Sequence, residues 1–266
     1  MHIHKVSSHP PVVSDETAVV FVHGAWHGEW CWSEHFLPYF ARHGYLGHAI
    51  DLRGHGQSDG AASLRRHRIA DYVDDVRSVV DGLDHVPVLV GHSMGGVVVQ
   101  KYLETGPATG AVLLATLPPA GGLAVAARLA RRYPFAMLKV LATRSLRPLV
   151  ATPRRTRELF FSEGITHVRL REHHNRLQDE SFRAFLDLIA FDRTHPERIR
   201  VPVPVLVLGA HRDSIITPAE VAATAAAYRT TPTLLPTAHD MMLDDGWSEV
   251  ADHIIRWLAQ IRTSRA

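Results

Sequence analysis

Five consecutive residues have the types and the spacing that can activate a serine. Gly91, His92, Ser93, Met94 and Gly95 follow a run of apolar residues and precede three valines. A strand that turns sharply into a helix holds such a serine in a strained conformation, and the close approach of the two elements leaves room only for glycine two positions to either side. We predict that Ser93 is a nucleophile. The simpler alternative is a glycine-rich turn that carries an exposed serine.

A serine hydroxyl needs a base, and the base needs a carboxylate that orients it. Asp213 follows the apolar run 203–208, and His239 follows a second apolar run that ends at Leu235. Loops at the carboxyl ends of parallel strands meet on one side of a sheet, so both side chains can reach Ser93. Alone, either residue is better explained as an ordinary loop residue. Together they predict a catalytic triad of Ser93, Asp213 and His239. Other acids lie nearby, but none ends a predicted strand ahead of the helix that Pro218 opens: Asp192, Asp240, Asp244 and Asp245.

The oxyanion formed in acyl transfer needs two donors, normally backbone N–H groups. Met94 directly follows the serine and begins a helix, so its N–H is one candidate. The loop after the apolar run 18–22 reads His-Gly-Ala-Trp-His-Gly, and we assign the second donor to Ala25. Trp26 is a candidate for the wall of a substrate pocket. No cofactor or metal is expected, because the histidines are scattered and their close pairs lack further ligands at metal-site spacing.

Short Val- and Leu-rich runs alternate with longer amphipathic stretches, the pattern of parallel strands joined by covering helices. This predicts an α/β fold with a mostly parallel sheet covered by helices on both faces. The expected strands are 18–22, 47–52, 86–90, 111–117, 203–208 and 233–235. Residues 120–200 interrupt the alternation with Arg-rich helical sequence, expected at 123–143, 155–162, 165–177 and 180–191. We therefore divide the chain into a core, 1–119 and 201–266, and an inserted helical cap or lid, 120–200.

Length and composition limit the number of domains, the location and the partners that can be expected. The chain has 266 residues, 46% of them hydrophobic, and no apolar run long enough to span a membrane, so we expect one catalytic domain, no stable membrane insertion and a cytoplasmic location. The single cysteine, Cys31, is expected to be buried filler. The net charge of +2 gives no reason to expect a nucleic-acid partner, and nothing indicates the oligomeric state.

Residues 121–200 carry 16 Lys and Arg against 8 Asp and Glu. A basic cap could favour an anionic substrate or an anionic surface, although ordinary solvated helix faces explain it more simply.

These motifs, in this order, resemble the α/β-hydrolase superfamily. The resemblance rests on His-Gly-Ala at 23–25, Asp-Leu-Arg-Gly-His-Gly-Gln-Ser-Asp at 51–59, Gly-His-Ser-Met-Gly-Gly at 91–96, Asp213 and His239. The loop at 23–28 is similar to the branch of plant methyl esterases and hydroxynitrile lyases, near haloperoxidase-like esterases. The lyases have a hydroxyl residue where this chain has Gly24 and a lysine where it has Asp240, so the esterases fit better. Only about 17 residues precede the first expected parallel strand, so the usual leading antiparallel strands must be shortened or partly absent.

The resemblance implies a serine hydrolase that cleaves a carboxylic ester or related acyl bond of a small molecule through an acyl-enzyme, without a cofactor. Two alternatives stay open. One is cleavage of a lactone, a thioester or a carbon–carbon bond on the same triad, and the other is a non-catalytic small-molecule receptor with this fold.

Overall fold

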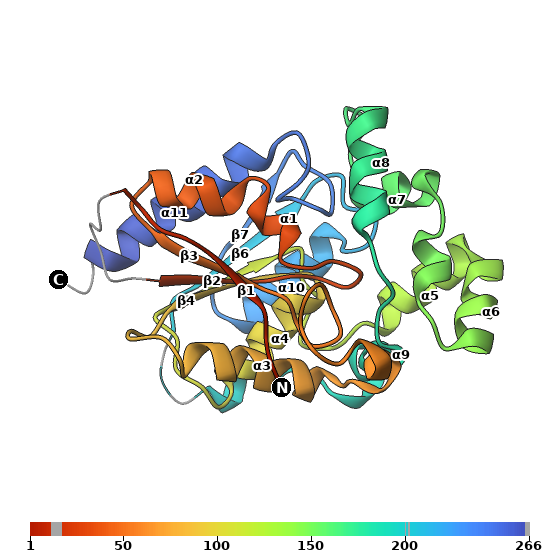
Figure 1. The fold of residues 1–266 in the computed structure, drawn as a ribbon, viewed down its shortest axis with the longest axis horizontal. Helices are drawn as coiled ribbons and strands as arrows, with labels where there is room; N and C mark the ends of the chain where they lie inside the picture. The colour runs from red at the N-terminus through yellow and green to blue at the C-terminus, as the bar shows by residue number, and fades with distance from the viewer. Residues whose placement is uncertain (12–17, 200, 202, 264–266) are drawn as a thin grey trace.

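One sheet forms the centre of the molecule in a computed structural model, which describes residues 1–11, 18–199, 201 and 203–263 (Figure 1). Its strands, in sequence order, are β1 (Lys5–Ser8), β2 (Ala18–Val22), β3 (Leu46–Ile50), β4 (Val88–His92), β5 (Gly110–Leu114), β6 (Val205–Ala210) and β7 (Pro232–Leu235). Their order across the sheet is β1-β3-β2-β4-β5-β6-β7. β1 runs antiparallel to β3, and the other neighbours are parallel. The mostly parallel sheet predicted from the sequence is confirmed.

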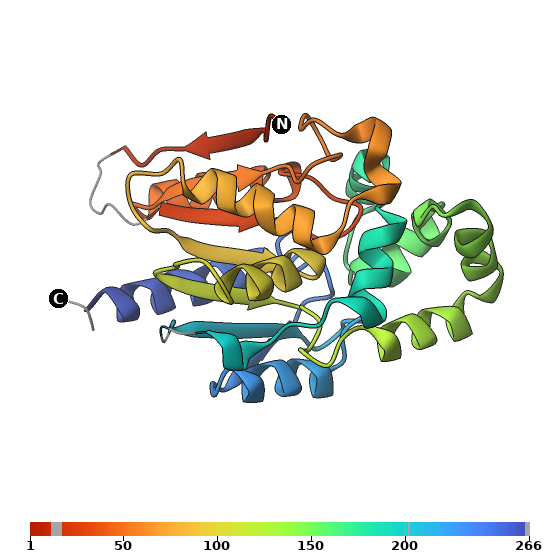
Figure 2. The ribbon, with the colours of Figure 1, turned by 90° about the horizontal axis from the view of Figure 1, so that it is seen from below.

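Helices cover both faces of this sheet, which is why its central strands can be apolar throughout. Every residue of β2, β4 and β5 is buried. One face is covered by α1 (Trp30–Ser33), α2 (Phe36–Arg42) and α11 (Trp247–Thr263), and the other by α3 (Ile69–Val80), α4 (Met94–Leu103) and α10 (Pro218–Ala227) (Figures 1 and 2). The helix expected to open at Pro218 is α10, and a capping box begins it, with Thr217 Oγ1 accepting from the Glu220 N–H. Cys31 is buried in the core, as expected, between Trp30 and Trp32, which are buried too.

The Arg-rich insertion is helical and lies beyond the carboxyl ends of the parallel strands (Figure 2). Its α-helices are α5 (Leu123–Arg132), α6 (Pro134–Thr143), α7 (Pro153–Phe160), α8 (His167–Arg176) and α9 (Phe182–Leu186). The single helical stretch expected at 123–143 is wrong in one respect, because it divides at Tyr133. Pro134 cannot donate to the preceding turn and starts a new helix instead. The division into core and cap stays a prediction, and its junction at residue 200 lies outside the described residues.

The amino-terminal region holds one feature that the sequence pattern did not locate. β1 pairs with β3 from Lys5 opposite Ile50 to Ser8 opposite Gly47. Among residues 1–11, one short antiparallel strand is described ahead of the parallel ones. Within the ranges described, no helix combines the length and the apolar character needed to cross a bilayer.

Candidate active site

Ser93 occupies the turn between β4 and α4 in a conformation that few residues adopt. Its φ of 51° and ψ of −117° lie outside the usual regions for a residue with a side chain. Glycine is required on both sides, since a Cβ on Gly91 would lie 2.5 Å from the Gly95 carbonyl oxygen and one on Gly95 would lie 2.4 Å from that of His23. The Ser93 N–H donates to the Leu114 carbonyl at 2.9 Å. The turn is thus fixed by close backbone contacts and places the Ser93 side chain at the carboxyl end of β4, a central strand.

His239 lies between Ser93 and Asp213. Its Nε2 is 3.1 Å from Ser93 Oγ, and its Nδ1 is 2.8 Å from Asp213 Oδ2. Asp213 follows β6, and His239 follows β7, so strand ends bring together residues that are 26 and 146 positions apart. Burial disfavours the charged imidazole, but the neighbouring Asp213 carboxylate outweighs it and raises the pKa of His239. The structure therefore joins all three predicted triad residues in one hydrogen-bonded chain.

Asp213 is itself held in place by the backbone. Its Oδ1 accepts from the N–H groups of Ile215 and Ile216, at 2.7 and 2.9 Å, which leaves Oδ2 for His239. The rival acids have other partners. Asp244 accepts from Ala238 N–H and from Ser162, and Asp240 accepts from His27.

The loop after β2 passes directly over the serine turn. A Cβ on Gly24 would lie 3.1 Å from Ser93 Cβ and 2.8 Å from His92 Nδ1, so a residue with a hydroxyl side chain does not fit there. Ala25 and Met94, the predicted oxyanion donors, both line the cavity that contains Ser93. Among the residues that the structure describes, neither backbone N–H has a hydrogen-bond acceptor. Both are therefore available to a ligand.

The cavity at Ser93 has a volume of about 60 Å³ and mostly apolar walls. Trp26 forms part of them, as expected. The other apolar walls come largely from the cap and include Val125, Leu129, Leu159, Phe185 and Leu188. The space beside Ser93 is therefore small and apolar.

One buried carboxylate also lines this cavity. Glu180 precedes α9, and its Oε2 accepts from His55 Nε2 at 3.0 Å and from the Trp26 N–H at 3.4 Å. Its Oε1 accepts from the Tyr72 hydroxyl and the Ser181 N–H. Burial disfavours the charged form of His55, yet the Glu180 carboxylate raises its pKa. Glu180 thus ties the cap to the loop of Ala25 and Trp26.

A second buried pair lies behind His239 and was missed by the sequence analysis. His27 Nε2 lies 3.0 Å from Asp240 Oδ2, and His27 Nδ1 lies 2.8 Å from the Ala25 carbonyl oxygen. His92 Nε2 donates to the His239 carbonyl at 2.9 Å, and burial lowers the pKa of His92 to about 3. No sequence signal links His27 to Asp240, which are 213 positions apart.

The same group contains residue types that can bind a metal ion. His92, His239 and Asp240 offer ligand atoms within 4.8 Å of one another. Both ring nitrogens of His239 are already hydrogen-bonded, to Ser93 and to Asp213. The arrangement is therefore suited to proton transfer through His239.

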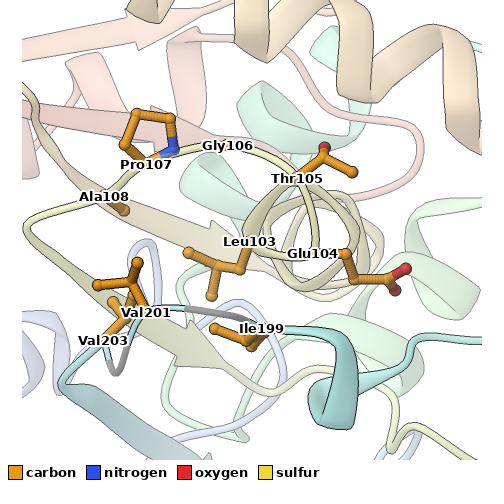
Figure 3. Close-up of a pocket in the computed structure, with 9 residues that line it drawn as sticks. All are labelled: Leu103, Glu104, Thr105, Gly106, Pro107, Ala108, Ile199, Val201 and Val203. Atoms are coloured by element: carbon orange, nitrogen blue, oxygen red, sulfur yellow. The ribbon is translucent and has the colours of Figure 1, made fainter.

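Figure 3 shows a different hollow, of about 440 Å³, at the far end of α4 from Ser93. It is lined by Leu103–Ala108 together with Ile199, Val201 and Val203. A helix of ten residues is about 15 Å long, so this hollow is remote from the triad. The carboxylate that it contains, Glu104, accepts from the His195 N–H and lies 3.4 Å from Lys101 Nζ. It offers no group arranged for catalysis.

A comparison with protein families agrees with this geometry. A model described as the alpha/beta hydrolase family matches residues 19–253, which is most of the chain. The chain belongs to the alpha/beta hydrolase family. The resemblance and the fold expected from the sequence are thereby confirmed.

Parts of the sequence of this alpha/beta hydrolase are similar to those of named proteins. The chain is 38% identical over 109 residues to a non-heme chloroperoxidase of Streptomyces lividans, a match that covers 40% of this chain and 38% of that protein. It is 35% identical over 109 residues to the probable esterase PIR7A of Oryza sativa subsp. indica, covering 39% and 40%. Each match thus spans about two fifths of the relative's length.

The similarity to solved structures covers nearly the whole chain of this alpha/beta hydrolase. A putative aryl esterase from Burkholderia cenocepacia has a TM-score of 0.76 at 19% identity, over 98% of this chain and 95% of that one. The putative non-heme bromoperoxidase BpoC from Mycobacterium tuberculosis has a TM-score of 0.73 at 21% identity, over 99% and 96%. At these identities the likeness concerns the fold alone.

Proposed function

We propose that this alpha/beta hydrolase cleaves carboxylic esters of small, uncharged molecules through an acyl-enzyme on Ser93. The observation that carries the proposal is the chain from Ser93 Oγ through His239 to Asp213, which opens into an apolar cavity. The esterase names among its relatives support the same reaction class.

The first step forms a bond between Ser93 Oγ and the ester carbonyl carbon as His239 Nε2 takes the hydroxyl proton. Asp213 keeps Nδ1 protonated and stabilises the imidazolium. The N–H groups of Ala25 and Met94 donate to the oxyanion. Its collapse breaks the ester bond, and His239 gives its proton to the departing alkoxide. Water then attacks the acyl-enzyme, loses a proton to His239 and releases the acid, and the proton returns to Ser93.

The cavity indicates the acyl group that the enzyme accepts. Its apolar walls favour a short hydrocarbon chain, and its charged wall residue is the carboxylate of Glu180 rather than an arginine of the cap. Arg128 and Arg154 pair with Glu220 and Glu158, at 2.8 Å each, and do not line this cavity. We therefore propose uncharged esters as substrates, in preference to the anionic ones that the basic cap first indicated. A cytoplasmic location stays a prediction.

A substrate panel tests the proposal. The pure protein and its Ser93→Ala variant should be assayed with matched acetate, butyrate and octanoate esters, a lactone and a thioester, and labelled with a fluorophosphonate probe. We expect labelling at Ser93, and turnover that is fastest with the short esters and lost in the variant. Labelling without turnover of any ester would contradict the proposal, and preferred cleavage of the lactone or thioester would reassign the bond.

A further inference from the structure

Helix α6 has an apolar face on the outside of the molecule. Phe135, Leu138 and Leu141 are 78%, 62% and 56% exposed. Their spacing of three residues places them along one side of the helix, whereas Ala136 and Val140 are buried on the other side. Single exposed apolar residues are common, but several together on one face mark an interaction site. We refer to Phe135, Leu138 and Leu141 as the α6 patch.

The sequence around the α6 patch is strongly basic. Residues 105–157 contain no Asp or Glu. The same stretch contains these cations: Arg128, Arg131, Arg132, Lys139, Arg144, Arg147, Arg154, Arg155 and Arg157. Three of them are exposed near the α6 patch and make no ion pair with any residue that the structure describes: Arg131, Lys139 and Arg144. The patch therefore combines exposed apolar side chains with unpaired positive charge.

The arrangement of the helices leaves this surface open. α6 lies at the end of the molecule farthest from the sheet in both views (Figures 1 and 2). A helix with apolar side chains on its outer face and cations at its margins can lie in the interface of a bilayer. The long cationic side chains then reach the headgroups while the apolar ones enter the acyl region.

We propose that the α6 patch docks on an anionic lipid surface. Charge complementarity selects this partner over a second copy of the chain, because a two-fold contact between α6 helices would bring like charges together. The proposal does not depend on ester hydrolysis. It gives the basic charge of the cap a role on the outer face of the cap. The preceding helix, α5, supplies Val125, Ala126 and Leu129 to the cavity at Ser93.

Co-sedimentation with vesicles tests the proposal. The full chain should be mixed with phosphatidylcholine vesicles and with vesicles in which about a third of the lipid is phosphatidylglycerol. We expect binding to the anionic vesicles, which weakens as salt rises, and little binding to the neutral ones. Lys139→Gln should weaken the partition coefficient about fivefold, the equivalent of about 1 kcal/mol for one cation near the surface. Phe135→Ser combined with Leu138→Ser should abolish binding at every salt concentration tested.

Val168→Ser is a matched control, because Val168 is a similarly exposed apolar residue, at 67%, on α8. It should leave vesicle binding unchanged, and all variants should keep the wild-type circular dichroism spectrum. Equal binding to both kinds of vesicle, no binding to either, or an equal loss in Val168→Ser would overturn the proposal. Size-exclusion chromatography adds a further outcome: a dimer that Phe135→Ser dissociates would make the α6 patch a contact between copies instead.

Discussion

Asp240, the residue that follows His239, accepts a hydrogen bond from His27 Nε2 at 3.0 Å, and both side chains are buried. The other ring nitrogen of His27 faces the Ala25 carbonyl oxygen at 2.8 Å. A buried carboxylate next to the candidate base is therefore connected, through one imidazole, to the carbonyl of Ala25, the residue whose own N–H we propose as an oxyanion donor. This connection makes Asp240 a positioning residue rather than the acid of the triad.

Asp240→Ala should consequently reduce both stability and turnover. Burial disfavours the carboxylate, but His27 outweighs it and lowers the pKa of Asp240 below its ordinary value. Its stabilising effect is thus present above the pKa of the unfolded chain, near 4, and is lost below it. At pH 7 the loss should be about 3 to 5 kcal/mol in the free energy of unfolding, because His27 is left buried without its partner.

Asp245→Ala is the control for that measurement, made by urea denaturation. Asp245 is half exposed and lies 3.4 Å from Arg169, so its removal should cost less than about 1 kcal/mol. Equal losses in the two variants would show that burial of the His27 pair has no energetic consequence.

Asp213→Asn should lower kcat by about 10⁴ while the fold is kept, because an amide favours the wrong tautomer of His239. Asp244→Asn, which alters a buried acid with no contact to His239, should have a much smaller effect on kcat per folded molecule. If Asp244→Asn or Asp240→Asn proved the more damaging to kcat, our choice of the orienting acid would be wrong.

The pH dependence of kcat/KM should report on His239. The imidazole must be neutral to accept the serine proton, so activity on a neutral ester should fall as the pH drops through its pKa. Asp213 raises that pKa above the ordinary histidine value of 6.5, so the midpoint should lie above 6.5. A rate that stays constant from pH 8 to pH 5 would rule out this role.

A negative charge on the substrate should lower kcat/KM, whereas the basic cap would by itself indicate that such a charge raises it. Glu180 is buried at the cavity, and salt screens a buried charge much less than an exposed one. The kcat/KM for a neutral ester should therefore exceed that for a matched ester with a carboxylate on its acyl chain, at low and at high salt alike. Preference for the anionic ester at low salt that disappears at high salt would instead support steering by the arginines of the cap.

Local patterns were sufficient for the parallel strands, and they indicated the two residues that the structure joins to Ser93. Six of the strands were expected within a few residues of their observed ends, because each is a short, mostly apolar run, and the central ones are buried on both faces. Asp213 was chosen because it follows such a run, and the structure brings it to His239. The division of the cap helix at Pro134 was missed, because a single helix was expected at 123–143, although a proline inside a helical pattern is a local sign that the helix ends.

Other features depended on contacts between distant parts of the chain. β1 is half exposed and polar, so it is a strand only because β3 offers an edge. The pairs of Asp240 with His27 and of Glu180 with His55 join residues 213 and 125 positions apart. No spacing rule predicts such pairs, because they depend on how the cap and the loops pack in three dimensions.

Glu180 also limits how the cap can move. The segment that contains it is bound on both sides, because the Gln178 N–H donates to the Trp26 carbonyl and the Gln178 side chain bonds with Gly54 and Gly56. Movement of this segment away from the core would separate Glu180 from His55 and leave both side chains without partners, at a cost of several kcal/mol. α5, which supplies Val125 and Leu129 to the walls, is tied to the core by the partly exposed Arg128, 2.8 Å from Glu220, and a partly exposed ion pair is weaker than a buried one. We expect the cap to hinge at Glu180 and to admit substrate on the side of α5, so exchange of amide hydrogens should be slow at 178–181 and faster along α5.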